Sequence, residues 1–534
     1  MIATIIRREF LDNLLSFKFV ACVLVAVMVS LASTSILTSD YQGRLKNYDV
    51  GVASARETLT KVPVYSCLKF RMFWKPTPLS IFIAGIERKA GSYAEFGTLQ
   101  IDIPASLQGG TTKNEFAASF SIFDFSAVII IIFSVLAILL SYGSISGEKE
   151  EGVLSLALAN SVPRHKILLG KYLGALVSIS VPLAMCFILG ILYLLFSKNI
   201  EIDRDFFVSM GILYCVSLLY LSAILILGIF ASSCTKTSFA SLLALLTFYL
   251  GFTFLIPQAV KSYATNAIMS RAKNVENNIQ ALQEERRKKG GEAFKNVGFK
   301  ETWMIPRDAD NMMAYGGIIL RRITSPEFIE NQSMITVIQS RLEREYAQKV
   351  YDLKSQDMAV EERIQRAQNT WLAFVPSTNF ARVTELVMDT GDESSRSFLR
   401  QVNLYWHQTM AYLDRKNAFG MRYFYPGPDA LTLYEKDLIM KITNDRVGQV
   451  KDPSGSSYLL RYNTGKYYGE AMKYSPPLTF LNLDDLPAFR PGHVGLAARL
   501  KTALFNVGIL IFYNIIFFAL AYVTFARYDP RRTG

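Results

Sequence analysis

The 534-residue sequence is poor in cysteine, histidine and charged residues. Its three histidines, His165, His407 and His493, are too scattered to indicate a zinc site. Of its five cysteines, only Cys67 lies outside the apolar stretches and the turns that join them, so no intramolecular disulfide is expected there. Charged residues make up 19% and hydrophobic residues 51% of the chain. This composition excludes a disordered chain, a collagen-like fibre and a small disulfide scaffold.

Catalytic and nucleotide-binding motifs are also missing. The sequence has no H-E-x-x-H and no G-x-S-x-G, and Gly170-Lys171 and Gly465-Lys466 lack the other residues of a phosphate-binding loop. We therefore expect a chain that is not an enzyme, binds no cofactor and binds no metal. The densest basic run, Arg286 to Lys289, follows Glu284 and Glu285 and is typical of a helix end, so no nucleic-acid partner is predicted.

The apolar residues are concentrated in six stretches of 21 to 30 residues each. About 20 apolar residues in a helix cross the hydrocarbon layer of a membrane. Backbone groups within lipid must be satisfied inside the segment, so each stretch is predicted to be a helix. The fold class expected is an all-α polytopic membrane protein, with spans at residues 19–39, 125–147, 172–197, 206–235, 237–260 and 502–526.

Lysine and arginine in the short flanks predict the orientation of the spans. Basic residues collect before the first span, between the second and third, between the fourth and fifth, and in the tail 527–534. The short loop between the third and fourth spans has more acidic than basic residues. Both termini are therefore predicted to be cytoplasmic, with segments 40–124 and 261–501 outside. None of the six spans contains an ionisable Asp, Glu, Lys, Arg or His, which disfavours a proton-coupled transporter.

Residues 1–18 have two interpretations. Arg7-Arg8 followed by an apolar stretch resembles a twin-arginine export signal. The alternative is an amphipathic helix at the membrane interface, because Ile2, Ile6 and Phe10 fall on one side and Arg8 on another. The apolar stretch is long for a removable signal and five more spans follow it, so the interfacial helix is the prediction.

The segment 261–501 makes up nearly half of the chain and is predicted to be mainly helical. Helices are expected at residues 262–289, 332–371 and 394–415, running away from the membrane and back. The aromatic side chains of the last helix are predicted to lie in a hydrophobic core. Loops with a hairpin are expected between Tyr423 and Leu486. In segment 40–124, residues 74–80 should be extended because of Pro76 and Pro78.

The loop 148–171 follows the second span and combines acidic residues, glycine and leucines. It begins Glu148-Lys149-Glu150-Glu151-Gly152-Val153-Leu154 and continues through Leu158 to Pro163 and Arg164. This predicts a short helix with an acidic start and an apolar body that a small loop cannot bury. The helix should therefore dock on a partner, or else lie in the membrane interface.

The pattern Glu148-x-Glu150-x-Gly152-x-Leu154, followed by 167–174 (Ile-Leu-Leu-Gly-Lys-Tyr-Leu-Gly), resembles the ABC-2 type exporter permeases. The nearest branch is that of the multicopper-enzyme maturation permeases with a large extracytoplasmic domain between the fifth and sixth spans. Val153 stands where the family usually has threonine, and Pro163 is displaced. Met312-Met313 is too slight a motif to support a link to copper.

The resemblance implies a coupling loop that receives the motion of a separate ATPase subunit, which carries ATP and Mg²⁺. Glu148, Glu150 and Glu151 would meet basic groups of that ATPase or cap the coupling helix; Leu154 and Leu158 would fill its groove. The family residues also include Gly152 and Arg164. Two ATPase subunits and a second permease chain are implied, in a bacterial cytoplasmic membrane. Alternatives from the sequence are a membrane-anchored scaffold or sensor whose outer domain binds a protein, and a passive channel, which the apolar spans disfavour.

Overall fold

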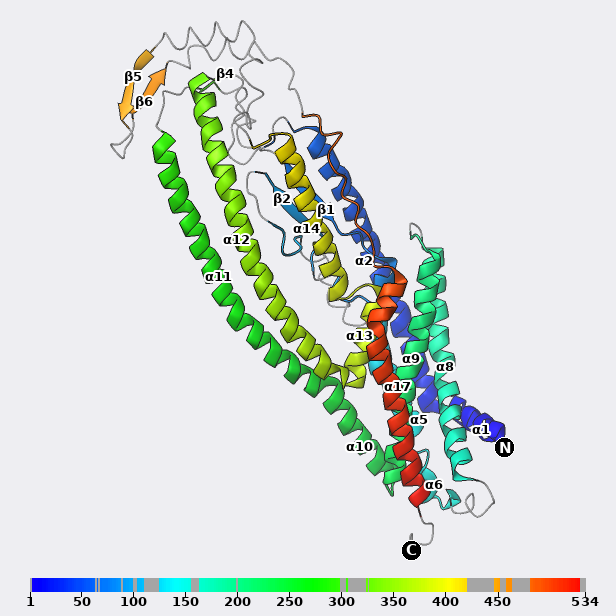
Figure 1. Cartoon of the computed structure of the whole chain (residues 1–534). Coiled ribbons are helices and arrows are strands. Elements are labelled where there is room, and N and C mark those ends of the chain that lie inside the picture. Colours follow the sequence, from blue (N-terminus) through cyan, green and yellow to red (C-terminus); the bar gives the residue numbers. More distant parts are fainter. Residues whose placement is uncertain are drawn as a thin grey trace.

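The computed structural model describes residues 2–62, 65, 68–87, 90–98, 103–109, 124–154, 163–197, 200–297, 304–305, 323–324, 326–419, 446–451, 458–462 and 481–528. Within them the protein is an elongated, mainly helical molecule (Figure 1). Six helices are long and apolar enough to span a membrane, which confirms the six predicted spans. Their bounds are Phe17–Thr60, Phe125–Glu150, Arg164–Phe196, Arg204–Cys234, Ser238–Asn266 and Leu496–Arg527.

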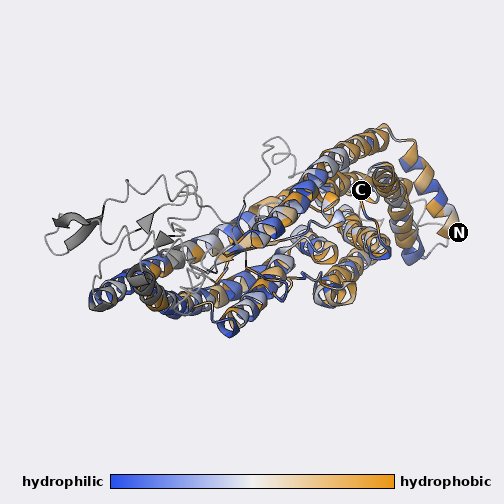
Figure 2. Ribbon diagram, turned by 90° about the horizontal axis from the view of Figure 1, so that it is seen from above, coloured by the Kyte–Doolittle hydropathy of each residue, from blue (hydrophilic) through white to orange (hydrophobic). Residues whose placement is uncertain are grey.

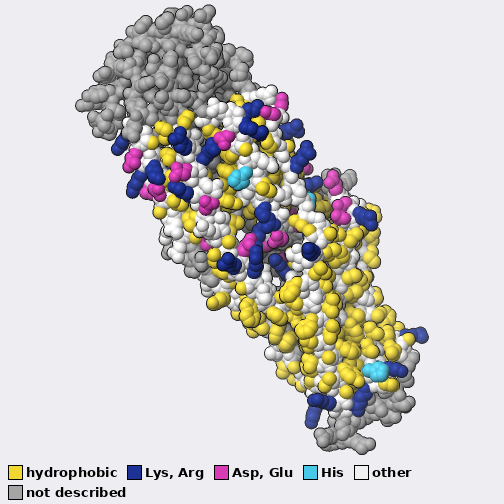
Figure 3. Space-filling model, viewed as in Figure 1, with side chains coloured by type: hydrophobic (Ala, Val, Ile, Leu, Met, Phe, Trp, Pro, Cys, Tyr) yellow, Lys and Arg dark blue, Asp and Glu magenta, His cyan; other side chains and the backbone are white. Residues whose placement is uncertain are grey.

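The spans are built from several helical elements. The N-terminal helix α1, Ile2–Leu14, precedes them and displays both hydrophobic and hydrophilic residues (Figure 2). On the face drawn in Figure 3, apolar side chains dominate the lower half, and basic side chains lie at its lower end. The span elements are α2 (Phe17–Thr60), α4 (Phe125–Val128), η4 (Ile129–Phe133), α5 (Ser134–Ser141), α6 (Ser146–Glu150), α8 (Arg164–Phe196), α9 (Arg204–Cys234), α10 (Ser238–Leu250), η5 (Gly251–Leu255) and α17 (Leu496–Arg527).

Helix α2 continues 21 residues beyond the predicted end of the first span at Ser39. Residues 40–60 contain no proline, and an ion pair between Arg44 and Asp40, with Nε and Oδ2 2.9 Å apart, supports the helix there. The span therefore extends as one rod out of the apolar region.

The half of the molecule beyond the apolar surface is here called the distal domain. It is organised around long antiparallel helices. Helix α11 continues the fifth span, and α12 packs along it. Helix α14 lies on the other side of α12, near the end of α2 (Figure 1). The bounds are α11 (Ile256–Val297), α12 (Pro326–Ala373) and α14 (Asp392–Arg415). These helices cover the three that the sequence predicted for segment 261–501.

Three short antiparallel strand pairs complete the described chain. The pair β1–β2 packs beneath α14, where Phe70 and Phe96 stack at 5.0 Å between ring centroids. The pair β5–β6 confirms the hairpin expected between Tyr423 and Leu486. The strands are β1 (Lys69–Phe73), β2 (Tyr93–Gly97), β3 (Met304–Ile305), β4 (Ile323–Thr324), β5 (Arg446–Lys451) and β6 (Tyr458–Tyr462).

The prediction of an extended segment at 74–80 is wrong at its end. Thr77 is extended, with ψ of 139°, as the residue before a proline should be. Residues Pro78–Ile81, however, form one 3₁₀ turn, η2. Proline has a fixed φ that suits the first position of a helical turn, so Pro78 starts this turn instead of extending the chain.

Two large hydrophobic cores and a third, smaller cluster around Leu154 hold the described part of the chain together. One fills the span bundle and includes the 13-residue helix α13, Pro376–Met388, which packs between α9 and α17. The Phe380 ring of α13 stacks on Tyr220 of α9 at 4.7 Å. The other core lies in the distal domain and contains Phe398, Val402, Trp406 and Met410. For the aromatic residues Phe398 and Trp406 this confirms the prediction.

Polar side chains also join the spans to one another. The Asn514 amide donates to the Leu219 carbonyl at 3.0 Å and its oxygen accepts from Ser222. Asn514 is thus an interhelical hydrogen-bonding group. The π-helical turn η4 leaves the Ile130 carbonyl free to accept from Tyr249 of α10 at 2.5 Å, which ties the second span to the fifth.

Candidate functional site

The candidate site is the region where the loop after α6 meets the lower ends of the spans. Its described residues run from Ser146 to Leu154 and resume at Pro163. Leu158 lies outside the described residues. At Gly152 the backbone has φ of +73°, a conformation that L side chains rarely adopt, so this turn requires glycine.

Glu148 contacts a lysine of the same chain. Its Oε1 lies 2.8 Å from Nζ of Lys171, which is 5% exposed at the start of the third span. The same Nζ lies 2.7 Å from Oε1 of Glu9 on α1. Glu148 thus pairs with a basic group of its own chain, whereas the sequence predicted a basic group of the ATPase or a helix cap. One buried cation joins α1, α6 and α8. We call Glu9, Lys171 and Glu148 the triad.

Two glycines let α1 approach α8 beside the triad. A Cβ at Gly170 would lie 2.7 Å from Ile5, and one at Gly174 would lie 2.6 Å from Glu9. Side chains at these positions would push α1 away from α8, as at other small-residue helix contacts in membranes. The Gly170-Lys171 and Gly174 positions thus serve packing and not phosphate binding.

Basic residues of the loop cap the carboxyl ends of two spans. Lys149 Nζ donates to the carbonyls of Ser233 at 2.6 Å and Thr235 at 3.0 Å, at the end of α9. Arg164 donates to the carbonyls of Phe525 at 3.2 Å and Tyr528 at 2.9 Å, at the end of α17. Unpaired carbonyls and the helix dipole favour cations at such ends. The sequence named Arg164 but gave no role to Lys149.

Glu150 is also held within the chain, because Ser238 Oγ at the start of α10 donates to its Oε2 at 2.7 Å. Together with the triad and the two caps, this contact connects the loop to α1, α8, α9, α10 and α17. A displacement of the loop is therefore expected to displace these five helices as well.

The prediction that Leu154 fills a groove of a partner is wrong for this structure. Leu154 is 1% exposed and packs inside the chain, in a cluster with Ile145, Ile167, Leu168, Ile229, Ala521 and Phe525. The close ends of α8, α9 and α17 supply a pocket for this leucine, which the sequence alone did not reveal. Glu151 and Val153 point outward instead, and Val153 is 36% exposed.

A second group of polar residues, here called the joint, links the spans to the distal domain. Arg44 of α2 lies 2.6 Å from Glu87 and donates to Ser80 at 2.9 Å. Asp124 caps the second span and also accepts from the Ala84 amide at 3.0 Å. The Ile86 amide donates to the Thr390 carbonyl at 2.9 Å, just after α13.

Burial changes the acid–base behaviour of the joint. Burial raises the pKa of Asp124 to about 6. Three backbone N–H groups stabilise the charged carboxylate and therefore oppose part of this rise. The pKa of Glu385 on α13 is raised to about 7, chiefly by burial. The nearby Arg382 opposes this rise, while Asp124 and Asp392 contribute to it. The pKa of Glu87 is raised by burial as well, partly offset by Arg44.

Within the described ranges, no cluster of three or more His, Cys, Asp or Glu side chains could hold a metal ion. The region around the loop after α6 joins several helix ends to one exposed loop. The joint connects those helices to the distal domain.

Comparison with known proteins identifies one family. Its sequence model, described as ABC-2 family transporter protein, matches residues 3–286, from α1 into α11. No protein with a curated description matches the chain.

Proposed function

The chain belongs to the ABC-2 family of transporter proteins, and from this membership we propose that an ABC ATPase drives its spans through the loop after α6. A member of this family is a multi-pass, non-catalytic membrane permease subunit of an ABC transporter. The proposal concerns how this chain receives the work done by its ATPase and what it does with it.

The observation that carries the proposal is the internal attachment of the loop. Lys171 binds Glu9 and Glu148, while Lys149 and Arg164 hold the ends of α9 and α17. A push on this loop would move five helices together. A loop that only connected two spans would have no need of a buried cation with two carboxylate partners, which is costly to desolvate.

The surface offered to the ATPase is the exposed side of the same loop. Glu151 and Val153 face outward on either side of Gly152, and residues 155–162, which include Leu158, follow. In our proposal Glu151 meets a basic group of the ATPase and Val153 lies at the edge of the contact. The buried side chain of Leu154 holds the turn at Gly152 against the ends of α8, α9 and α17.

The orientation that we propose places the lower end of the bundle in the cytoplasm. Figure 3 shows Lys and Arg side chains at that end of the apolar surface, in agreement with the rule that cytoplasmic flanks are basic. The α6 loop and both termini lie towards this end (Figure 1). The distal domain is then extracytoplasmic, in a bacterial cytoplasmic membrane.

In the complete transporter we propose two such permease chains, identical or related, on two ATPase subunits. ATP-driven closure of the ATPases pushes the two loops, and the spans rock. The work is delivered as export of a substrate, as force on the distal domain, or as both, because the joint connects α2, α4 and α13 to that domain. A protein partner of the distal domain is compatible with the second mode.

The proposal is tested by changing the exposed side of the loop. The tagged protein is purified from its host in mild detergent, and co-purifying proteins are identified and assayed for ATP hydrolysis. Glu151→Arg combined with Val153→Asp should remove the ATPase. Val50→Asp is the matched control, since Val50 is also exposed but lies on the distal half of α2.

Retention of the ATPase by the loop variant would contradict the docking surface. Purification of the unmodified protein with a soluble partner but no ATPase would favour the alternative of a membrane-anchored scaffold or sensor.

A further inference from the structure

The distal domain contains a cavity of about 790 Å³ that the transporter cycle described above does not use. One wall is a stripe of α2, made by Tyr48, Val52, Ala55, Arg56, Leu59 and Thr60. The floor is strand β1 with Tyr405 of α14, and the other wall is the segment of residues 481–491. The volume is within the range of small-molecule sites in proteins, about 300–1,000 Å³.

The wall formed by residues 481–491 is held in place at several points. The Leu481 amide donates to the Val62 carbonyl at 2.9 Å. Gln401 exchanges two hydrogen bonds with the backbone of Gly492, at 3.0 and 2.7 Å. Between these ends, Asp485 accepts from Tyr412 at 2.8 Å and pairs with Lys416 at 2.6 Å. The cavity is therefore preformed and does not need a ligand to order its wall.

The lining of the cavity combines apolar and aromatic side chains with a nearly equal share of polar surface. The Phe489 ring lies 5.2 Å from that of Tyr405, and Phe70 lies 6.4 Å from Tyr405 between ring centroids. Each wall contributes apolar side chains, among them Val52, Met72 and Leu486. These side chains give an apolar chain a surface on which to pack.

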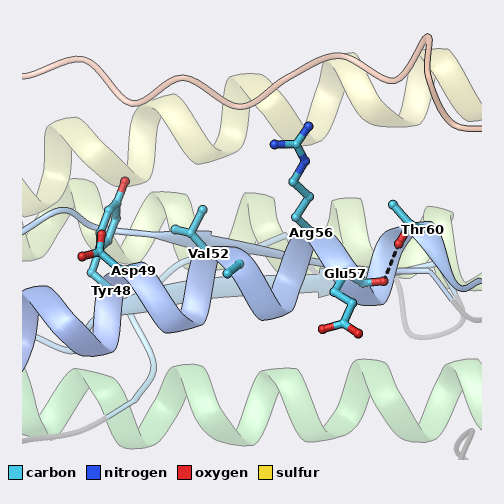
Figure 4. A pocket seen from close by; sticks show the side chains of 7 residues that line it. Tyr48, Asp49, Val52, Arg56, Glu57 and Thr60 are labelled. Carbon is cyan, nitrogen blue, oxygen red and sulfur yellow. Dashed lines mark hydrogen bonds between the residues drawn. The ribbon is translucent and has the colours of Figure 1, made fainter.

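Arg56 places a guanidinium at the cavity that is not engaged in an ion pair with a described residue. Figure 4 shows Arg56 extending from α2 towards the neighbouring wall, while Glu57 points to the opposite side of the helix. Arg56 is exposed and has no ion-pair partner among the described residues. The second arginine of the lining, Arg71, is already paired with Glu95.

Asp484 is the acidic residue of this lining. A carboxylate placed at Arg56 gains from the guanidinium, whereas Asp484 repels any anion that comes close to it. A more open hollow of about 550 Å³ shares Tyr48, Val52, Arg56 and Thr60 with the cavity, and Asp49 and Glu57 also line it (Figure 4). Glu57 is paired with Lys61.

We propose that this cavity binds an amphiphile with a long apolar chain and a single terminal carboxylate. The chain lies on β1, Tyr405 and Phe489, and the carboxylate meets the guanidinium of Arg56. This site is separate from the loop after α6, and its occupancy can be measured without an ATPase.

The test uses the full-length protein in lipid nanodiscs and palmitic acid that carries a photoactivatable diazirine. After illumination, labelled peptides are identified by mass spectrometry. Labelling is expected at residues 48–60, 70–73 and 481–491, and it should be removed by excess unlabelled palmitic acid. The methyl ester of the same probe lacks the negative charge and should label these peptides about tenfold less, since about 1.4 kcal/mol of binding free energy is a factor of ten.

Variants separate the charge from the cavity itself. Arg56→Gln should reduce labelling by the acid about tenfold, Arg56→Lys should retain part of it, and Glu57→Gln should leave it unchanged. Ala55→Trp should block labelling by filling the cavity. Labelling confined to the spans, equal labelling by acid and ester, or full labelling of Arg56→Gln would each overturn the proposal.

Discussion

At the scale of single residues, Lys171 is central to the stability of the region around the loop after α6. It is nearly buried and its ammonium group contacts two carboxylates from different helices. Lys171→Met should lower the free energy of unfolding by about 3 kcal/mol, because the change leaves two partly buried glutamates without their cation. The measurement is chemical denaturation in detergent.

The matched control for this change neutralises the whole triad. Glu9→Gln and Glu148→Gln added to Lys171→Met should recover most of the lost stability, since removal of all three charges leaves none unpaired. Equal stability of Lys171→Met and the unmodified protein would contradict the role of the triad.

Buried carboxyl groups at the joint predict a pH-dependent stability. An acid whose pKa is raised on folding binds its proton more tightly in the folded state, so the stability falls as the pH rises through the window between the two pKa values. For Glu385 that window runs from 4.5 to about 7, and for Asp124 from 3.8 to about 6. The thermal midpoint in detergent should thus decrease between pH 5 and pH 8.

Glu385→Gln should make that decrease smaller and raise the midpoint at pH 8, because glutamine carries no charge into the buried site. Glu292→Gln serves as control, since Glu292 is exposed on α11. A midpoint of the Glu385→Gln variant that varies with pH as steeply as that of the unmodified protein would show that Glu385 is not the titrating group.

The sequence alone could not predict which residues pair with one another in the triad. Lys171 lies 162 residues from Glu9 and 23 from Glu148, and no local pattern connects them. The sequence did mark Gly170, Lys171 and Gly174 through their family resemblance. It could not show that a lysine at the start of a span is buried, because that depends on where α1 packs.

At the scale of whole elements, the contact between α1 and α8 depends on the absence of side chains at Gly170 and Gly174. Gly174→Leu should displace α1, because even a Cβ would lie 2.6 Å from Glu9. The displacement can be measured as increased labelling of a cysteine introduced at Ile5. Gly211→Leu on α9 is the control, since no neighbouring atom lies within 4 Å of a Cβ there, and it should leave the labelling unchanged.

The attachment of the η2 region to α13 depends on another glycine. Gly85 has φ of +52°, and a Cβ there would lie 2.1 Å from the Thr390 carbonyl oxygen. Gly85→Ala should therefore lower the stability by at least about 2 kcal/mol, through backbone strain and loss of the contact that Ile86 makes with Thr390. A thermal midpoint within one degree of the unmodified protein would contradict this account.

Elements were predictable from the sequence where a long uniform pattern existed. The six spans follow from apolar runs, and α11, α12 and α14 follow from helical periodicity. Helix α13 was missed because its 13 residues mix Asn379, Glu385 and Arg382 with its apolar face. The β1–β2 pair was missed because its five-residue strands carry charged residues on the exposed side.

At the scale of the whole molecule, the protein connects an exposed loop at one end with a large domain at the other. The loop holds the ends of five helices, the first span runs unbroken into the distal domain, and the joint fastens that domain to the second span and to α13. This arrangement is suited to carrying mechanical work over the length of the chain.

The most direct test of this account is the rate of ATP hydrolysis by the complex reconstituted in proteoliposomes, with the bound ATPase quantified in the same samples. The account predicts a stoichiometric ATPase with both the unmodified protein and the Lys171→Met variant, but hydrolysis about tenfold slower with the variant, because the loop is no longer tied to α1 and α8. No bound ATPase with the unmodified protein, or an unchanged rate with Lys171→Met, would contradict it.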